Sequence, residues 1–298
     1  MPRNYYYLVS GLKEYTLDSD TKGLDTALLR DEIMEALSPK DKELLTLFCY
    51  FYDITNIINF LQGRTTRFNT LGNLSKEEVG DIVEAFRRKN NPSGIEEEES
   101  TGEKKLPGYL KKIFTAYKEG NQENGITDDD GIRTRMAIDN ALWTAYYDKA
   151  THSSNPFLKE WYAFDRDIRN ISAAYTARAK WKEITPNLIG NNEITQNLAQ
   201  SNANDFGLKD EFGYIDELVQ ILETKDILSK ERKLDVLRWD KINDMTTFDY
   251  FNINMLLGYM AKLSIINRWI ILDKETGREM FNKLIGELTD EKLLSKEI

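Results

Sequence analysis

The sequence predicts an all-α protein made of three repeated helical units, and three observations support this. Only 6 prolines and 17 glycines occur among 298 residues. The stretches between them are rich in Leu, Ile, Lys and Glu, which favour helices. A polar pattern, Asp-Ile-x-Asn-Ile, also recurs within two long apolar segments. A repeated pattern of this kind indicates a repeated structural unit.

The first long helix is expected from Pro39 to about Gly63. Ser38 supplies a capping hydroxyl, and proline suits the first helical position because its missing N–H would have no partner there. Apolar residues recur at steps of three and four, at Leu44, Leu47, Phe48, Phe51, Ile54, Ile57, Ile58 and Leu61. This stripe is wide, so the helix is expected to pack on more than one side.

The next segments alternate between helix and loop. Ser75 and Glu78 form a capping-box pattern that opens a helix to Arg88. Residues 91–108, with an acidic run at 96–99, are expected to be an exposed loop. Residues 127–131 resemble the start of a calcium loop. Their later ligand positions would hold Ile132 and Asp139, so they are interpreted as a helix N-cap.

The second half is expected to be helical apart from one boundary region. The helix after residue 131 should end near His152, and Asn155-Pro156 should open another that ends near Glu183. Residues 184–206, rich in Asn, Gln and Ser, form the boundary region, with a short helix near 195–199. The remaining helices are expected at about 208–224, 228–246, 248–272 and 275–288.

The repeat defines a structural motif with three copies. Its residues are Asp53, Asn56 and Arg64 in the first copy, Asp167, Asn170 and Arg178 in the second, and Ser264 and Asn267 in a weaker third. Each arginine follows its aspartate by about three helical turns, so Asp, Asn and Arg are expected on one face. In the third copy Glu275 stands in place of the arginine. This spacing predicts units at residues 1–105, 106–205 and 206–298.

The motif is interpreted as structural. A buried carboxylate needs a partner, which an arginine of a neighbouring helix could supply, and the asparagine could bond a broken helix end. Such polar pins would fix how the helices align. Five aromatic residues could suggest a platform for nucleic-acid bases, but their helical spacing favours a place in the core. They are Trp161, Tyr162, Phe164, Tyr175 and Trp181.

Composition argues against several functions. The formal charge of −10 is a poor match to nucleic acid. The one cysteine, Cys49, and the one histidine, His152, argue against disulfides, multi-cysteine metal sites and two-histidine motifs. They are interpreted as a core residue and as a capping or surface residue. No apolar run approaches a membrane span, and the apolar stretch at residues 5–9 is too short for a signal peptide.

Sequence motifs for catalysis are missing as well. The chain has no Walker-type phosphate loop, no dinucleotide-binding glycine pattern, no G-x-S-x-G elbow and no zinc helix. We therefore expect a non-catalytic protein with no cofactor, no metal and no small-molecule substrate. A cryptic helical hydrolase that uses carboxylates stays open as a minor alternative.

Several segments together resemble a known family. They are residues 137–147, 157–171 and 178–180, residues 52–59 and, more loosely, residues 256–268. This set is similar to the C subunit of V/A-type rotary ATPases, called subunit d in eukaryotic enzymes. The opening residues 4–12 depart from the usual start of that family and look like a divergent bacterial branch.

The resemblance implies both a shape and a role. It implies a funnel-like, pseudo-threefold helical body on the cytoplasmic face of the membrane. Its partners would be the proteolipid ring and the central-stalk subunits, and it would transmit torque for ion transport coupled to ATP synthesis or hydrolysis. Contact with the inner face of the cell membrane would run through these proteins. The alternative is an unrelated cytoplasmic all-helical scaffold or adaptor, which would differ in its partners.

Overall fold

A computed structural model of the protein describes residues 4–88, 101–123 and 128–294. These residues form twelve α-helices and one 3-10 turn and contain no strand, so the predicted all-α class is confirmed. The first helices are α1 (Tyr6–Gly11), α2 (Thr26–Ala36), α3 (Pro39–Leu61), α4 (Lys76–Arg88), α5 (Thr101–Lys105), α6 (Gly108–Glu123) and α7 (Asp128–Thr151). The others are α8 (Pro156–Ala179), η1 (Thr185–Asn187), α9 (Glu193–Gln200), α10 (Ile215–Glu223), α11 (Ile227–Thr246) and α12 (Ile253–Leu294).

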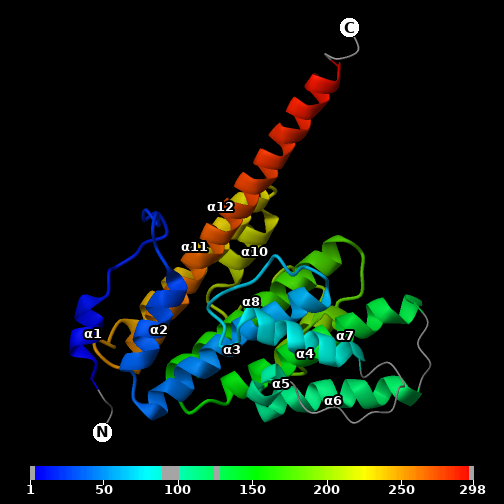
Figure 1. Ribbon diagram of the computed structural model, residues 1–298. Helices are drawn as coiled ribbons and strands as arrows, with labels where there is room; N and C mark the ends of the chain where they lie inside the picture. Colours follow the sequence, from blue (N-terminus) through cyan, green and yellow to red (C-terminus); the bar gives the residue numbers. More distant parts are fainter. Residues whose placement is uncertain (1–3, 89–100, 124–127, 295–298) are drawn as a thin grey trace.

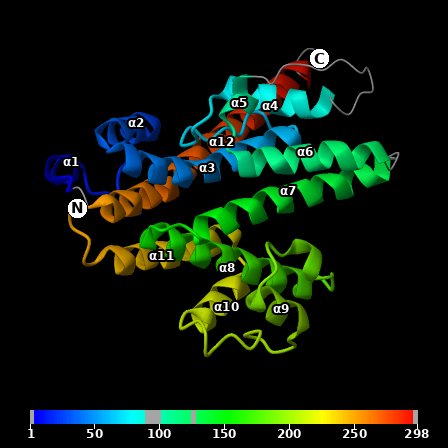
Figure 2. The same ribbon diagram turned by 90° about the horizontal axis from the view of Figure 1, so that it is seen from below.

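Helix α8 lies at the centre of the body. It contacts α7, α9, α10, α11 and α12, while α3 packs on α4, α7 and α12. Figure 2 shows α9 and α10 gathered on one side of the molecule and α4 and α5 on the opposite side, with α7 and α8 between them. Among the described residues, the buried apolar side chains form a single core whose members range from Tyr5 to Ile265.

The two proline-initiated helices begin where the sequence predicts. Ser38 Oγ accepts a hydrogen bond from the Asp41 N–H at 3.3 Å, and Asn155 Oδ1 accepts one from the Leu158 N–H at 2.9 Å. Both caps precede a proline at the first turn. Each therefore satisfies one of the N–H groups that a helix start leaves without a partner.

Helix α12 differs from the prediction of two helices at 248–272 and 275–288. It is one continuous helix of 42 residues, and Figure 1 shows it running from the body far beyond the other helices. No proline interrupts its sequence, and Gly277, which costs a helix only about 1 kcal/mol, is too weak a breaker on its own. At 1.5 Å per residue the helix is roughly 60 Å long.

Part of the predicted exposed loop at 91–108 is instead helical. Thr101–Lys105 form α5, and Gly102 is buried against α4. The acidic run at 96–99 lies outside the described residues. Sequence reasoning also missed α2 and α6. Asp25, whose side chain accepts from the N–H groups of Ala27 and Leu28, is a capping signal that could have revealed α2.

Trp181 is exposed, which corrects its predicted place in the core. Its side chain is 98% accessible, and its φ of 55° places it in the left-handed region just after α8. Its N–H donates to the Arg178 carbonyl, and the Lys182 N–H donates to the Ala177 carbonyl. This is the helix-ending arrangement in which glycine usually takes the left-handed position. The backbone therefore turns away at this point and carries the indole out of the core.

Two segments are long and apolar enough, by length and composition alone, to cross a membrane. They are Pro39–Leu61 and Ile253–Asp273, of whose apolar windows 56% and 50% is buried inside the protein. The sequence-based expectation that no apolar run approaches the length of a membrane span therefore applies only to uninterrupted apolar runs. Core helices of globular proteins meet the same criterion, and both segments also carry fully or largely buried polar residues.

Two glycines test the packing of α5 on α4. A Cβ on Gly102 would lie 2.2 Å from the Glu78 carbonyl oxygen, whereas a Cβ on Gly80 would meet nothing within 4 Å. We expect Gly102→Ala to lower the free energy of unfolding by about 1–3 kcal/mol, because the backbone must shift. Gly80→Ala should raise it by up to about 1 kcal/mol, because alanine favours the helix. Urea denaturation measures both, and equal effects would contradict the close packing.

Candidate functional site

The first copy of the motif holds the segment that follows α3. Asn56 Nδ2 donates to the Asn69 carbonyl at 2.8 Å, and the Asn69 N–H donates to Asn56 Oδ1 at 2.8 Å. One amide thus satisfies both backbone groups of one residue. Asp53 accepts from the N–H groups of Asn73 and Leu74 at 3.0 and 2.9 Å, and from the Asn73 side chain at 2.7 Å. Arg30 of α2 donates to the carbonyls of the same segment.

The second copy repeats the asparagine contact. Asn170 Nδ2 donates to the Ile189 carbonyl at 3.0 Å, and the Ile189 N–H donates to Asn170 Oδ1 at 2.8 Å. Asp167 differs from Asp53, since its ion pair is with its chain neighbour Arg166, at 3.4 Å. The sequence suggested that an arginine of a neighbouring helix would pair with each aspartate, and the structure shows no such pair at Asp53 or Asp167. Backbone donors take that place at Asp53.

The third copy joins α12 to the first copy. Asn267 Nδ2 donates to Asn69 Oδ1 at 3.2 Å, and Asn267 Oδ1 accepts from Thr26 Oγ1 at 2.9 Å. Ser264 donates within its own helix, to the Ala261 carbonyl at 2.7 Å. Asn69 is therefore bonded by asparagines of both α3 and α12.

Arg64 does not share a helix face with Asp53, contrary to what the spacing suggested, whereas Arg178 lies three turns after Asp167 on the same helix, α8. Arg64 lies beyond the end of α3, where Gly63 has a left-handed φ of 78°, and it is exposed. Arg178 is on α8, but it donates to the carbonyls of Ser201 at 2.6 Å and Ala203 at 2.7 Å. Its guanidinium lies 3.9 Å from the centre of the Phe206 ring. Arg178 therefore bonds backbone carbonyls of another segment, and Arg64 points to solvent.

The single histidine is exposed, whereas the single cysteine is buried. His152 is exposed at the end of α7, with Nδ1 2.7 Å from the Asp148 carbonyl. Cys49 is fully buried, and burial raises the pKa of its thiol well above the ordinary value. A buried thiol of this kind is a poor nucleophile.

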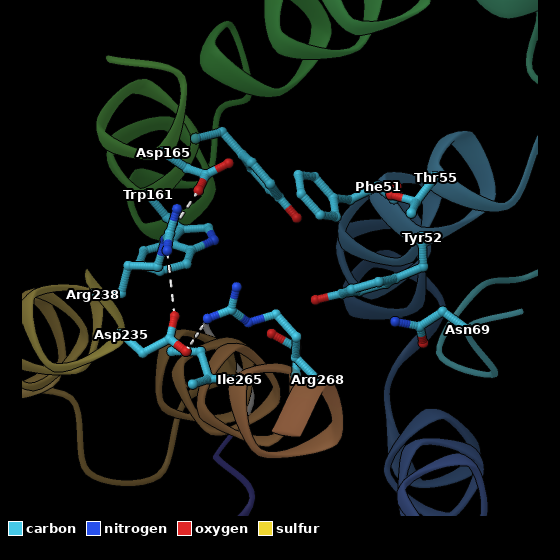
Figure 3. Close-up of a pocket in the computed structure, with 12 residues that line it drawn as sticks. Phe51, Tyr52, Thr55, Asn69, Trp161, Asp165, Asp235, Arg238, Ile265 and Arg268 are labelled. Atoms are coloured by element: carbon cyan, nitrogen blue, oxygen red, sulfur yellow. Dashed lines mark hydrogen bonds and ion pairs between the residues drawn. The ribbon is translucent and has the colours of Figure 1, made fainter. Parts of the chain in front are cut away.

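A cavity of about 260 Å³ lies where α3, α8, α11 and α12 meet. Figure 3 shows Phe51 and Tyr52 of α3 facing it from one side, with Trp161 of α8 and Arg268 of α12 opposite. We call this cavity the junction pocket. The three helices that carry the motif copies, α3, α8 and α12, all contribute lining residues.

A chain of charged groups crosses the far wall of the junction pocket. Asp165 Oδ1 lies 3.5 Å from Arg238 Nε, and Arg238 Nη1 lies 3.3 Å from Asp235 Oδ1. Asp235 is almost fully buried and also pairs with Arg268, which continues to Glu231 at 2.6 Å. The chain links α8, α11 and α12. Breaking one partner of a buried pair typically costs about 3–5 kcal/mol.

Behind this wall the charges continue into an aromatic cluster. The Tyr147 hydroxyl donates to Asp165 Oδ2 at 2.5 Å and accepts from Arg169 Nη1 at 3.2 Å. Burial raises the pKa of Tyr147 well above its ordinary value, so the phenol keeps its proton. The Arg169 guanidinium lies 4.1 Å from the Trp143 ring centre, a cation–π distance.

This arrangement favours binding and rigidity over acid–base chemistry. Every carboxylate oxygen of Asp165 and Asp235 is engaged, the last by the Trp269 Nε1–H at 2.8 Å. In the part of the chain that the structure describes, no group of three or more His, Cys, Asp or Glu side chains is placed to hold a metal ion. Sequence reasoning missed this network, because only Asp235 and Arg238 are spaced as helical neighbours.

The asparagine contacts can be tested on one pair of residues. Asn170→Ala should lower the free energy of unfolding by about 2–4 kcal/mol, because it leaves both backbone groups of the buried Ile189 without partners. Asn59→Ala is the control, since Asn59 makes a single 3.2 Å bond to the Arg67 carbonyl and should cost about 1 kcal/mol or less. Chemical denaturation measures both. Similar losses would show that the paired contact adds nothing.

A pH dependence follows from Asp167. Burial raises its pKa from 3.8 to about 6, so between these values the folded protein holds a proton that the unfolded chain releases. This contribution stabilises the fold at low pH and is lost as the pH rises through about 6. We expect Asp167→Asn to show a smaller loss of unfolding free energy between pH 5 and pH 7.5 than wild type, by about 1.4 kcal/mol. Parallel pH profiles would contradict it.

Comparisons with known proteins correct the resemblance drawn from the sequence. The model of a family described as a protein of unknown function, DUF2764, matches residues 2–292. An uncharacterized protein of Chlamydia muridarum is 21% identical over 296 residues, covering 93% of this chain and 96% of its own. No solved structure matches. Assignment to the C-subunit family of rotary ATPases is therefore wrong, since it rested on short motifs of low specificity. The chain belongs to the DUF2764 family.

Proposed function

We propose that this protein is a non-catalytic coupling subunit that joins two protein partners. The path of α12 carries the proposal, because this helix starts at one edge of the body, contributes Ser264, Asn267 and Arg268 to the polar contacts at its centre, and continues far beyond it (Figure 1). A helix that is held by the body along its first part and projects beyond it can transmit force or movement from one bound partner to another.

The opposite side of the molecule presents an exposed aromatic surface. Tyr7, Phe248 and Tyr250 are 98%, 87% and 67% accessible. Helix α1 and the loop before α12 lie side by side there, because the Tyr5 N–H donates to the Phe251 carbonyl at 2.6 Å. We call Tyr6, Tyr7, Phe248, Tyr250 and Phe251 the aromatic end. Exposed tyrosine and phenylalanine side chains in a cluster are typical of protein interfaces.

The polar contacts between α12 and the rest of the body make a stiff connection between the projecting end of α12 and the aromatic end. Asparagines tie α12 to α2 and to the segment after α3, and ion pairs tie α12 to α11 and α8. Movement of α12 relative to the body would break several buried polar contacts together. The projecting helix and the aromatic end are therefore expected to move as one unit.

The specific form that we propose is a central-rotor subunit of a V/A-type ATPase. It would couple the central stalk to the membrane proteolipid ring, in ion transport driven by ATP hydrolysis or driving ATP synthesis. The three repeat helices that meet at one junction support a funnel-like, pseudo-threefold body. A net charge of −10 supports a cytoplasmic, peripheral position held by protein contacts, because anionic lipid would repel it. An unrelated helical adaptor is the alternative.

Co-purification from the native host tests this function. The tagged chain is recovered from gently solubilised membranes, and its partners are identified and counted. Recovery of proteolipid-ring and central-stalk subunits in a fixed ratio is the expected result. A chain that stays alone in the soluble fraction, or that brings down other proteins in a fixed ratio, would overturn the rotor role.

Substitutions at the aromatic end test whether that surface binds a partner. We expect Tyr7→Ser with Phe248→Ser to reduce partner recovery at least about tenfold, because exposed aromatic anchors dominate interfaces. The melting temperature should not change, since both side chains are exposed. Trp181→Ser is the control, because Trp181 is equally exposed at the end of α8. Unchanged recovery in the double variant would contradict the assignment.

A further inference from the structure

We propose that the junction pocket binds a small aromatic carboxylate. Aromatic side chains of α3 and α8 form one part of its wall, and the other part carries Arg238 and Arg268 together with the two carboxylates that they pair with, Asp165 and Asp235. This inference goes beyond the coupling role, because it assigns the protein a small-molecule ligand. It does not depend on which partners the protein joins.

The size of the pocket limits the ligand. A cavity of about 150 Å³ lined by apolar side chains is enough for benzene. The junction pocket has about 260 Å³ and is partly open to solvent. It therefore suits one bicyclic ring, or one substituted ring with a short polar arm, and is too small for a nucleotide or a peptide segment.

The walls favour a flat, aromatic ligand. Phe51, Tyr52, Trp161 and Tyr162 all line the pocket, and most of its surface is apolar. Phe51 and Tyr162 have ring centres 6.1 Å apart, and Figure 3 shows Phe51 and Tyr52 directed toward the space between α3 and the opposite helices. Rings placed at different angles around a cavity can contact a guest ring by face and by edge.

The polar groups favour a ligand that accepts hydrogen bonds. The carboxylate oxygens of Asp165 and Asp235 are already engaged by Arg238, Arg268, Tyr147 and Trp269. The two guanidinium groups also carry N–H donors that these carboxylates do not use. Among the described residues, Arg238 Nη2 and Arg268 Nε have no hydrogen-bond partner.

A carboxylate is the acceptor that best matches these donors. Guanidinium groups bind carboxylates through paired, charge-assisted hydrogen bonds. Figure 3 shows the Arg268 side chain between α12 and α11, with its guanidinium directed toward Asp235 at the edge of the pocket. Arg169, behind Asp165 and linked to it through Tyr147, adds a third positive charge to this region. A ligand held here would contact α3, α8 and α12 together and so stabilise the junction.

Three probes with the same ring and different charge test the proposal. They are indole-3-acetate, indole-3-acetamide and tryptamine, added to the full-length protein up to about 5 mM. Ligand-observed saturation-transfer NMR measures binding, and the melting temperature reports stabilisation by mass action. We expect indole-3-acetate to bind saturably and at least about tenfold more tightly than tryptamine. Equal binding of all three probes, or no saturable binding of indole-3-acetate, would overturn the proposal.

Two variants locate the binding. Arg268→Met should weaken indole-3-acetate at least about tenfold, because it removes a guanidinium donor. Ser264→Leu fills the pocket without touching an ion pair and should abolish binding, and it decides the matter if Arg268→Met does not fold. Arg232→Met is the control, since Arg232 pairs with Asp18 outside the pocket. Binding that survives Ser264→Leu would place the probe elsewhere and refute the site. Co-purification of partners with the wild-type chain tests the coupling role, and its outcome does not depend on whether the pocket binds the probe.

Discussion

A side-chain amide that satisfies both backbone groups of one distant residue is the contact on which this fold depends. Asn56 makes it to Asn69 and Asn170 makes it to Ile189. Both partners belong to segments without helix or strand, where a buried N–H or carbonyl has no regular partner. The asparagine on the preceding helix supplies that partner. The irregular segment can therefore pack against an apolar helix without leaving the backbone N–H and carbonyl of that residue unpaired.

These contacts place the polar junction at the centre of an otherwise aromatic and aliphatic core. Asn267 bonds the side chain of Asn69, so the long helix α12 is tied to the same point that Asn56 holds. Asp235 and Arg268 then connect α12 to α11, and Arg238 extends the connection to Asp165 on α8. Such buried ionic contacts add little net stability compared with apolar packing, but they specify one alignment of the helices. The proposed coupling role requires one fixed alignment, and the junction pocket lies between the helices that these contacts align.

The sequence predicted the class and the helix starts better than the contacts. Ser38-Pro39 and Asn155-Pro156 act locally, so their geometry follows from neighbouring residues. Arg64 was misplaced because three helical turns were counted past the true end of α3. The partners of Asp53 could not be predicted, since backbone donors 20 residues away leave no sequence signal. Asp165, Asp235 and Arg268 come from three helices, and only the packed structure brings them together.

We infer that the motif asparagines hold the irregular segments as firmly as the helices are held. Hydrogen exchange of the Asn69 and Ile189 amides, resolved by NMR, tests it most directly, because both N–H groups donate to asparagine side chains. Protection equal to that of amides in the middle of α3 and α8 is the predicted result. Exchange as fast as in the exposed turn around Gly63 would show that these contacts open independently of the fold and do not hold the segments.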